Sequence, residues 1–368
     1  MNLRVAVARY RRGIRRPLAT ARGVVVEREG LILSLTDPQG RIGRGEAAPI
    51  SWIDGEPLDD VAYDLARLGD TLELPERVLD GEDTRRSTWH HEIGRGLRPS
   101  ARAALDAASL DLAARRAGIS AAKRLGAGRE VPVPVNAMVV EARSEEVADA
   151  VRARIERGYH VVKLKVGAGQ PRLDIERVGA ARAALRGGAT LRLDANAAWS
   201  FDVAREVLAA IGPTSVDYVE EPLANPTAEA LARLGAEVGV VLAVDESFDR
   251  LGGVEGLATS RCCDVVVLKP ARVGGPTRTV VIARRLVESG LRVVLTDAIE
   301  TAVGRAAVVH AAAALATTGV SEAIGLGGLE LLAPDAGADV SDDIVDVTAC
   351  LAEGPGLAVK AVRAKWIE

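Results

Sequence analysis

From residue 131 onward, short runs of valine, leucine and isoleucine alternate with longer segments in which apolar residues recur every three or four positions. The short runs have the length and composition of buried strands, and the longer segments have the period of amphipathic helices. This alternation is typical of βα units, whose strands lie parallel. We expect eight strands, at 131–140, 161–166, 191–196, 216–222, 240–247, 263–270, 291–297 and 322–328. Eight strands with short helical connections, and no GxGxxG motif after the first, favour a closed (β/α)8 barrel of the modified TIM type in the α/β class.

The first 125 residues follow another pattern. Apolar and polar residues alternate, which predicts antiparallel strands at 3–9, 22–27 and 31–36. "DPQG" at 37–40 has the composition of a hairpin turn, and 98–118 has the period of one long helix. We therefore expect an α+β domain at 1–125, the barrel at 126–345, and a strand-like segment at 346–368 that packs back on the first domain.

Residues 11–22 are rich in arginine and also contain glycine and proline. We interpret "RRGIRRP" as an exposed, mobile loop. If the rest of the chain supplies a site for an anionic substrate, this loop is expected to act as a lid over it.

Composition excludes several classes of protein. Hydrophobic residues make up 48% and charged residues 27% of the chain, which is ordinary for a soluble globular protein. With 47 basic and 51 acidic residues, the net charge of −4 gives no electrostatic case for nucleic acid. No apolar stretch approaches the ~20 residues of a membrane span. The adjacent Cys262 and Cys263 fit neither a disulfide framework nor a metal motif, so we expect buried thiols in a reducing, cytoplasmic environment.

Charged residues close five consecutive barrel strands, from the second to the sixth. They are Lys165, Asp194, Glu220, Asp245 and Lys269, and they follow one another at roughly one βα unit. Because the carboxyl ends of parallel barrel strands meet at one mouth, all five side chains are expected to lie together there.

Three carboxylates without histidine or cysteine form an oxygen-only ligand set, which suits Mg²⁺ or Mn²⁺ better than zinc. One such acid alone would be interpreted as a surface or capping residue, but three on adjacent strands predict a metal site formed by Asp194, Glu220 and Asp245. Glu221 must face away from Glu220 on an extended strand, so we expect it to support the site. Glu300, beyond the seventh strand, is expected to do the same.

Lys163 and Lys165 lie on one face of the second strand, ~7 Å apart. A second cation and partial burial both lower a lysine pKa, so we expect Lys165 to act as a general base. Lys269 faces it from the sixth strand. Two lysines with a divalent ion suit removal of the proton α to a carboxylate, with metal and ammonium stabilising the enediolate. A Schiff-base lysine would not need three carboxylates nearby.

The sequence resembles the enolase superfamily and, within it, the muconate-lactonizing subgroup and its o-succinylbenzoate synthases. The resemblance covers nearly the whole chain. It is carried by "GRGEAAPI" (43–50) of a capping domain, the helix at 98–118, "VVKLKVG", "LRLDANAAWS", "VEEPL", "VDES", "VVLKPARVGG" and "AIETAVGRAAVVHAAAAL".

The resemblance implies a lyase of menaquinone biosynthesis that uses Mg²⁺ or Mn²⁺ and a small carboxylate substrate. Lys165 would be the base and later the proton donor in a syn dehydration of 2-succinyl-6-hydroxy-2,4-cyclohexadiene-1-carboxylate to o-succinylbenzoate. Lys269 would be a fixed cation, and Lys163 with Arg192 would steady the enediolate. The implied substrate contacts are Arg192, Asn196, Thr296, Asp297, Glu300 and Gly327. A homo-oligomer is compatible with this assignment.

The sequence departs from this family's pattern at the seventh strand. Thr296 and Asp297 stand where such synthases have serines, and an aspartate repels a dicarboxylate unless it is paired, with Arg305 as a candidate partner. No histidine precedes "DAIET", which argues against a mandelate racemase. The eighth strand ends in "GLGG" at 325–328 and lacks the paired aspartates with which dipeptide epimerases bind an amine.

Other functions remain open. Lys165 and Lys269 on opposite faces also suit an N-acylamino acid racemase or a dipeptide epimerase, and muconate cycloisomerisation is a more distant alternative. Because all five charged positions are retained, we do not expect a non-catalytic homologue.

Overall fold

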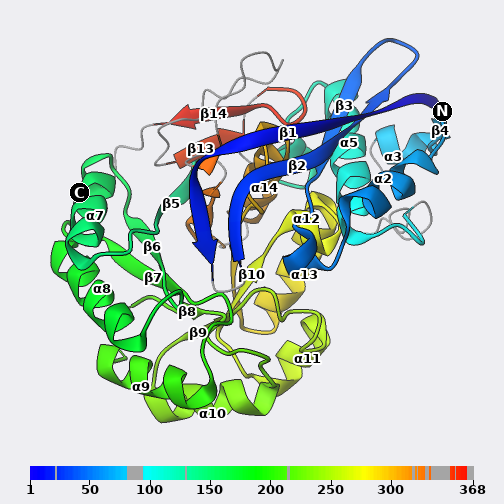
Figure 1. The fold of residues 1–368 in the computed structure, drawn as a ribbon. Coiled ribbons are helices and arrows are strands. Elements are labelled where there is room, and N and C mark those ends of the chain that lie inside the picture. Colours follow the sequence, from blue (N-terminus) through cyan, green and yellow to red (C-terminus); the bar gives the residue numbers. More distant parts are fainter. Residues whose placement is uncertain are drawn as a thin grey trace.

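The computed structural model describes residues 1–20, 23–80, 94–128, 131–213, 216–316, 320, 322–327, 331–332, 349–352 and 354–362. An antiparallel sheet with its helices stands beside a ring of parallel strands surrounded by helices (Figure 1). The predicted α/β barrel with an α+β domain before it is therefore confirmed.

The first domain contains a four-stranded sheet in the order β3-β2-β1-β4. Its strands are β1 (Asn2–Thr20), β2 (Gly23–Thr36), β3 (Ile42–Ala47) and β4 (Thr71–Glu73), and its helices are α1 (Ser51–Asp54), α2 (Leu58–Ala66), α3 (Glu76–Asp80), α5 (Pro99–Ala117) and α6 (Ala121–Arg124). Helix α5 packs directly on β3. A Cβ at Gly43 or Gly45 would lie 2.1 Å or 1.9 Å from a carbonyl oxygen of α5, so only glycine permits this approach.

The segment expected to be a mobile loop at 11–22 is a strand as far as it is described. β1 continues to Thr20 and pairs with β2, with one irregularity between Gly13 and Leu18. Residues 21 and 22 lie outside the described residues. The expectation failed because it considered the arginines alone, whereas Arg11 pairs across the strands with Glu27 and Glu29. The resulting hairpin of β1 and β2 runs across the barrel (Figure 1).

All eight expected barrel strands are present. They are β5 (Val133–Val139), β6 (Val161–Lys165), β7 (Thr190–Asp194), β8 (Val219–Glu220), β9 (Leu242–Val244), β10 (Val265–Leu268), β11 (Arg292–Leu295) and β12 (Ile324–Gly325). Consecutive strands from β5 to β11 pair in parallel. β12 closes the ring, because it pairs with β5 and a bridge joins Thr296 to Gly325.

Helices cover the outside of this ring (Figure 1). They are α7 (Ser144–Glu156), α8 (Pro171–Ala184), α9 (Phe201–Ile211), α10 (Ala228–Val238), α11 (Gly253–Ser260), α12 (Pro270–Val273), α13 (Pro276–Glu288) and α14 (Ala302–Ala316). The main hydrophobic core lies between the strands and these helices.

The C-terminal segment does not pack on the first domain alone. β13 (Ala349–Ala352) pairs antiparallel with the barrel strand β5, and β14 (Val359–Val362) pairs with β13. The Leu357 amide donates to Asp111 of α5, and His310 of α14 contacts the Ala358 carbonyl. β13 pairs with Val133 and Pro134 of β5, directly before the residues of β5 that pair with β12. Residues 346–348, 353 and 363–368 lie outside the described part.

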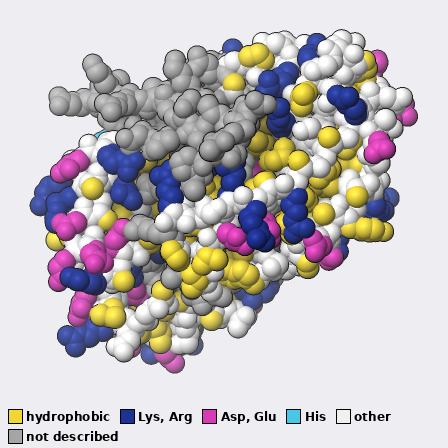
Figure 2. Space-filling model, turned by 45° about the horizontal axis from the view of Figure 1, so that its top comes forward, with side chains coloured by type: hydrophobic (Ala, Val, Ile, Leu, Met, Phe, Trp, Pro, Cys, Tyr) yellow, Lys and Arg dark blue, Asp and Glu magenta, His cyan; other side chains and the backbone are white. Residues whose placement is uncertain are grey.

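Basic and acidic side chains are interspersed on the face shown in Figure 2. Among the helices that the structure describes, none combines the length and the apolar character needed to cross a bilayer.

Candidate active site

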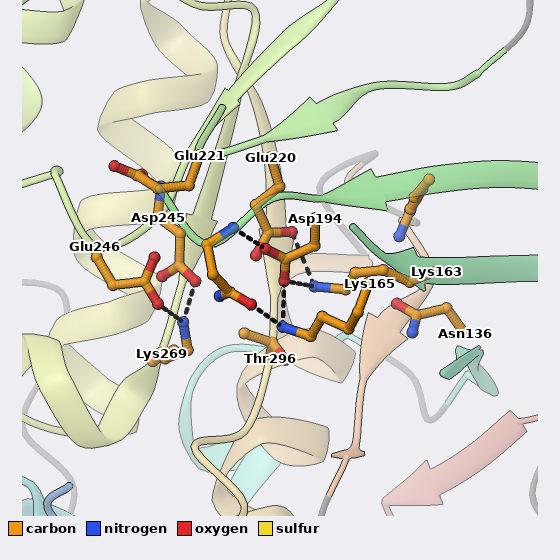
Figure 3. Close-up of polar contacts among 12 residues, drawn as sticks. Asn136, Lys163, Lys165, Asp194, Glu220, Glu221, Asp245, Glu246, Lys269 and Thr296 are labelled. Atoms are coloured by element: carbon orange, nitrogen blue, oxygen red, sulfur yellow. Dashed lines mark hydrogen bonds and ion pairs between the residues drawn. The ribbon is translucent and has the colours of Figure 1, made fainter. Parts of the chain in front are cut away.

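The five charged residues at the strand ends are brought together at one mouth of the barrel (Figure 3). Strand register causes this, because Lys165 is paired with Asp194 and Asp194 with Glu220 across β6, β7 and β8. Asp245 and Lys269 directly follow β9 and β10. Their functional roles stay predictions, but their proximity is observed.

Each lysine contacts a carboxylate in this structure. The Lys165 Nζ lies 2.5 Å from Asp194 Oδ2 and 3.0 Å from Asn196 Oδ1. The Lys163 Nζ lies 2.8 Å from Glu220 Oε2 and 3.6 Å from Asp194 Oδ2. The Lys269 ammonium pairs with Asp245 on the far side (Figure 3). Lys165 and Lys269 thus flank the carboxylates from opposite sides.

Neighbouring carboxylates dominate the pKa values of Lys163 and Lys269. Burial lowers the pKa of Lys163, but the charges of Glu220 and Asp194 outweigh it, so the pKa is raised. For Lys269, burial is likewise outweighed by Asp245 and Glu246, and the pKa is raised, while Arg272 lowers it. The neighbouring carboxylates, which were treated only as metal ligands, dominate over the second lysine.

The three carboxylates fit a divalent cation by their chemistry. All three are buried, and burial together with the Asp194 charge raises the pKa of Glu220 well above its usual value. Such mutual repulsion is relieved by a cation with oxygen ligands. Within the described ranges no group of three acidic, histidine or cysteine side chains is already assembled as a metal cluster. In this arrangement Lys163 bridges Asp194 and Glu220 instead.

Glu221 supports this site from behind. Its Oε2 accepts the Asp245 amide at 2.8 Å and the Ser247 amide at 3.4 Å. Burial, followed by the charge of Glu246, raises its pKa to about 7. Glu221 therefore holds the backbone that carries Asp245.

A cavity of about 100 Å³ lies over the five charged groups. Four predicted substrate contacts line it: Asn196, Thr296, Asp297 and Gly327. Gly328 of the "GLGG" motif lies outside the described residues. The cavity's apolar wall is formed by Leu18, Val25, Ile50, Ile53, Val135, Met138, Ala298, Ile299 and Leu326.

Arg192 does not line this cavity. Its guanidinium bonds to Asp217, Glu322 and the Ala323 carbonyl at the other end of the strands, where Arg292 joins the same two acids. It stands two residues before Asp194, the last residue of β7, and so occupies a deeper layer of the barrel. The predicted contact of Arg192 with substrate is therefore corrected.

Glu300 is also displaced from the cavity. It is buried, and its carboxylate accepts the Ala298 amide at 3.1 Å. Burial, followed by the charges of Glu46 and Asp297, raises its pKa to about 8. It supports the loop after β11 rather than contacting the cavity. Arg305, the candidate partner of Asp297, donates to the Glu300 carbonyl.

Five polar or sulfur-containing side chains that the sequence did not point to also line the cavity: Asn136, Met138, Tyr159, Glu246 and Arg272. The Glu246 Oε1 lies 3.5 Å from the Lys269 Nζ, and the Arg272 Nη1 lies 3.9 Å from the Glu246 Oε1. Arg272 could have been found, since it lies one helical turn after Lys269 in "KPAR".

Comparisons with known proteins agree with this geometry. The family model described as "Enolase C-terminal domain-like" matches residues 146–365. A D-Ala-D/L-Ala epimerase of Cytophaga hutchinsonii is 28% identical over 81% of this chain and 80% of its own length. An o-succinylbenzoate synthase of Thermobifida fusca is 38% identical over 57% of this chain and 63% of its own.

The likeness extends to solved structures. A dipeptide epimerase from Enterococcus faecalis V583, solved with Mg and the dipeptide L-Leu-L-Tyr, has a TM-score of 0.85 at 25% identity and covers 98% of this chain and 99% of its own. Both the barrel match and the strand-end carboxylates and lysines point to one conclusion: this chain belongs to the enolase superfamily.

Proposed function

We propose that this protein is a metal-dependent racemase or epimerase that moves the α-proton of an N-acylated amino acid, a dipeptide included. The observation that carries the proposal is the placement of Lys165 and Lys269 on opposite sides of the three carboxylates. Inversion at a carbon needs a proton carrier on each face. The similarity to an epimerase over 81% of the chain supports the same reaction class.

The chemistry is divided between the two lysines. One takes the α-proton from one face, and the other returns a proton to the opposite face. A divalent cation held by Asp194, Glu220 and Asp245 would supply positive charge that acidifies the α-proton of a bound carboxylate. Burial and Arg272 act to lower the pKa of Lys269, and Asp245 and Glu246 act to raise it. Lys163 remains as a buried cation beside Glu220.

The cavity favours substrates with apolar groups. Aliphatic side chains from both domains line the cavity, among them Leu18, Ile50 and Ile299. Burial of apolar surface contributes roughly 25 cal/mol per Å². Asp297 adds a negative charge to this region, which disfavours a second carboxylate on the substrate.

Dehydration to o-succinylbenzoate is the second candidate. The 38% identity to a synthase over 57% of the chain favours it. It needs only one base, with Lys269 as a fixed cation. The two reactions therefore make different demands on Lys269.

Proton exchange in D₂O distinguishes them. We expect the wild type to exchange the α-proton of both enantiomers of an N-acyl amino acid or of dipeptide epimers. Lys269→Arg should abolish exchange for one enantiomer and retain it for the other, because arginine stays protonated. Lys165→Ala should affect the other enantiomer instead, and its rate of α-proton exchange should fall about 10²–10⁴-fold.

Lys123→Arg, on α6, is the matched control and should behave as wild type. If the wild type converts the cyclohexadiene carboxylate and exchanges no acyl amino acid, the racemase proposal is replaced by the dehydration. Lys269→Arg should then retain measurable activity, because a fixed cation is enough.

The metal requirement is a separate prediction. Asp194→Asn, Glu220→Gln and Asp245→Asn should each abolish turnover, because loss of one anionic ligand weakens a hard divalent cation. Mg²⁺ or Mn²⁺ should restore activity to EDTA-treated wild type. Full activity after exhaustive EDTA treatment would contradict the proposed metal site.

A further inference from the structure

Arg28 of β2 connects the two domains next to the cavity. It is only 3% exposed. Its Nη1 donates to the Pro49 carbonyl at 3.1 Å, and its Nη2 donates to the Ala48 carbonyl of the first domain. Its Nε donates to the Ile299 carbonyl at 3.1 Å, and Nη2 also reaches the Ala298 carbonyl at 3.2 Å. One guanidinium therefore holds the backbone that follows β3 and the backbone that follows β11.

Both of these backbone segments form the apolar wall of the cavity. The first continues directly into Ile50 and Ile53, and the second contains Ala298 and Ile299. Ile299 has φ of 60°, in the left-handed region, which is unfavourable for a β-branched residue. A conformation of this kind costs roughly 1–3 kcal/mol and persists only where surrounding contacts hold it. Arg28 supplies such contacts on the Ile299 and Ala298 carbonyls.

The chemistry of arginine suits this task. Its planar fork carries five N–H donors, whereas a lysine ammonium is a compact point charge that cannot reach four carbonyls in two segments. Glu46 of β3 makes a second connection further along the same loop. It accepts the Thr301 amide and the Gly304 amide, each at 2.9 Å.

We propose that Arg28 is the positioning residue that holds the apolar wall of the cavity, and that it thereby sets which substrate side chains the site accepts. The statement about substrates rests on the proposed function. The statement about the wall does not, because it concerns only the two backbone segments.

Arg28→Lys tests the proposal, since it keeps the buried charge and removes the fork. Amide hydrogen exchange should become faster in peptides that contain 48–53 and 297–301. With L-Ala-L-Phe as substrate, KM should rise about 10-fold while kcat stays within about 3-fold. With L-Ala-L-Ala, KM should change less, because its methyl group needs little of the wall. Arg11→Lys, an exposed arginine of the same hairpin, is the matched control and should change neither measurement.

Unchanged amide hydrogen exchange in the peptides that contain 48–53 and 297–301 would overturn the proposal. An equal loss of kcat for both dipeptides would also overturn it, since it would show a role in chemistry or in folding only. If the wild type does not exchange the α-proton of any acyl amino acid, the proposed function fails. Backbone amide hydrogen exchange alone then decides whether Arg28 holds the wall.

Ile299→Gly is a second variant in case Arg28→Lys does not fold. Glycine adopts this φ without strain, so the variant should fold, and it removes a wall side chain. It should reproduce the selective rise in KM for L-Ala-L-Phe. A uniform effect, or none, would show that this wall does not select substrates.

Discussion

At the scale of single residues, the charged neighbours of a buried acidic side chain decide what it does in this protein. Glu300 and the carboxylates at the strand ends are all buried, but lysines contact the strand-end carboxylates, whereas Glu300 has Glu46 and Asp297 nearby. Its carboxylate serves the Ala298 amide rather than a ligand. A buried acid without a strong cationic partner favours its protonated form.

This environment gives the stability of the protein a dependence on pH. The Glu300 pKa is raised from 4.5 to about 8 in the folded state. Between these values the folded state binds more protons than the unfolded state, so the free energy of unfolding falls as pH rises through this window. Glu300→Gln should therefore stabilise the protein at pH 8.5 by on the order of 1–3 kcal/mol and change little at pH 4.5. Denaturant unfolding at the two pH values measures this.

Glu288→Gln, which replaces an exposed glutamate, is the matched control for the loss of a carboxylate. Equal effects of Glu300→Gln at both pH values would contradict the raised pKa.

At the scale of elements, the hairpin of β1 and β2 brings the first domain to the active site. Leu18 and Val25 pair across the two strands, line the cavity, and pack against Leu331 beyond the eighth barrel strand. A bridge between Ile14 and Leu332 joins the hairpin to the same segment. The hairpin is therefore a wall of the site rather than a solvated loop.

We expect Leu18→Ala to weaken this element selectively. Removal of a buried leucine side chain costs about 2–5 kcal/mol where the surroundings do not collapse. Amide exchange at 14–20 and 23–26 should become faster, and KM for an apolar dipeptide should rise about 10-fold. Val24→Ala, exposed on the same hairpin, is the matched control. Identical exchange of the hairpin with and without Mg²⁺ and dipeptide would count against its role in closing the site.

At the scale of the whole molecule, two layers of charge inside the barrel have separate roles. The layer at the carboxyl ends contains the candidate active site. The deeper layer consists of four residues joined by ion pairs: Arg192, Asp217, Arg292 and Glu322. They lie in or next to β7, β8, β11 and β12, so the ion pairs connect strands β7 and β8 with strands β11 and β12. Arg192 also stacks over the Tyr218 ring at 4.8 Å.

Arg192→Met should separate these roles. Loss of one partner from a buried ion-pair network costs about 3–5 kcal/mol, so the free energy of unfolding should fall by that amount. Below the unfolding transition, kcat/KM should stay within about 3-fold of wild type. Arg172→Met, which removes an exposed ion pair with Glu176, should leave stability within about 1 kcal/mol. Lost activity at unchanged stability would restore Arg192 as a substrate residue.

The sequence by itself determined the barrel and which charged residues lie at its mouth. Strand and helix periods are local, and a charged residue at the end of a buried strand can be placed because parallel strands share one direction. For this reason Lys165, Asp194, Glu220, Asp245 and Lys269 could be assigned to one site before their partners were known.

Only the tertiary structure decided which of these groups meet and what encloses them. The pKa of Lys163 depends on carboxylates from other strands, and the strand at 11–20 is paired with β2. Arg192 lies in the deeper layer of the barrel, and Arg28 contacts carbonyls some 270 residues away. The physical reason is the same in each case: hydrogen bonds, ion pairs and burial depend on distances in space, and a local pattern along the chain carries no record of partners that only the closed barrel brings together.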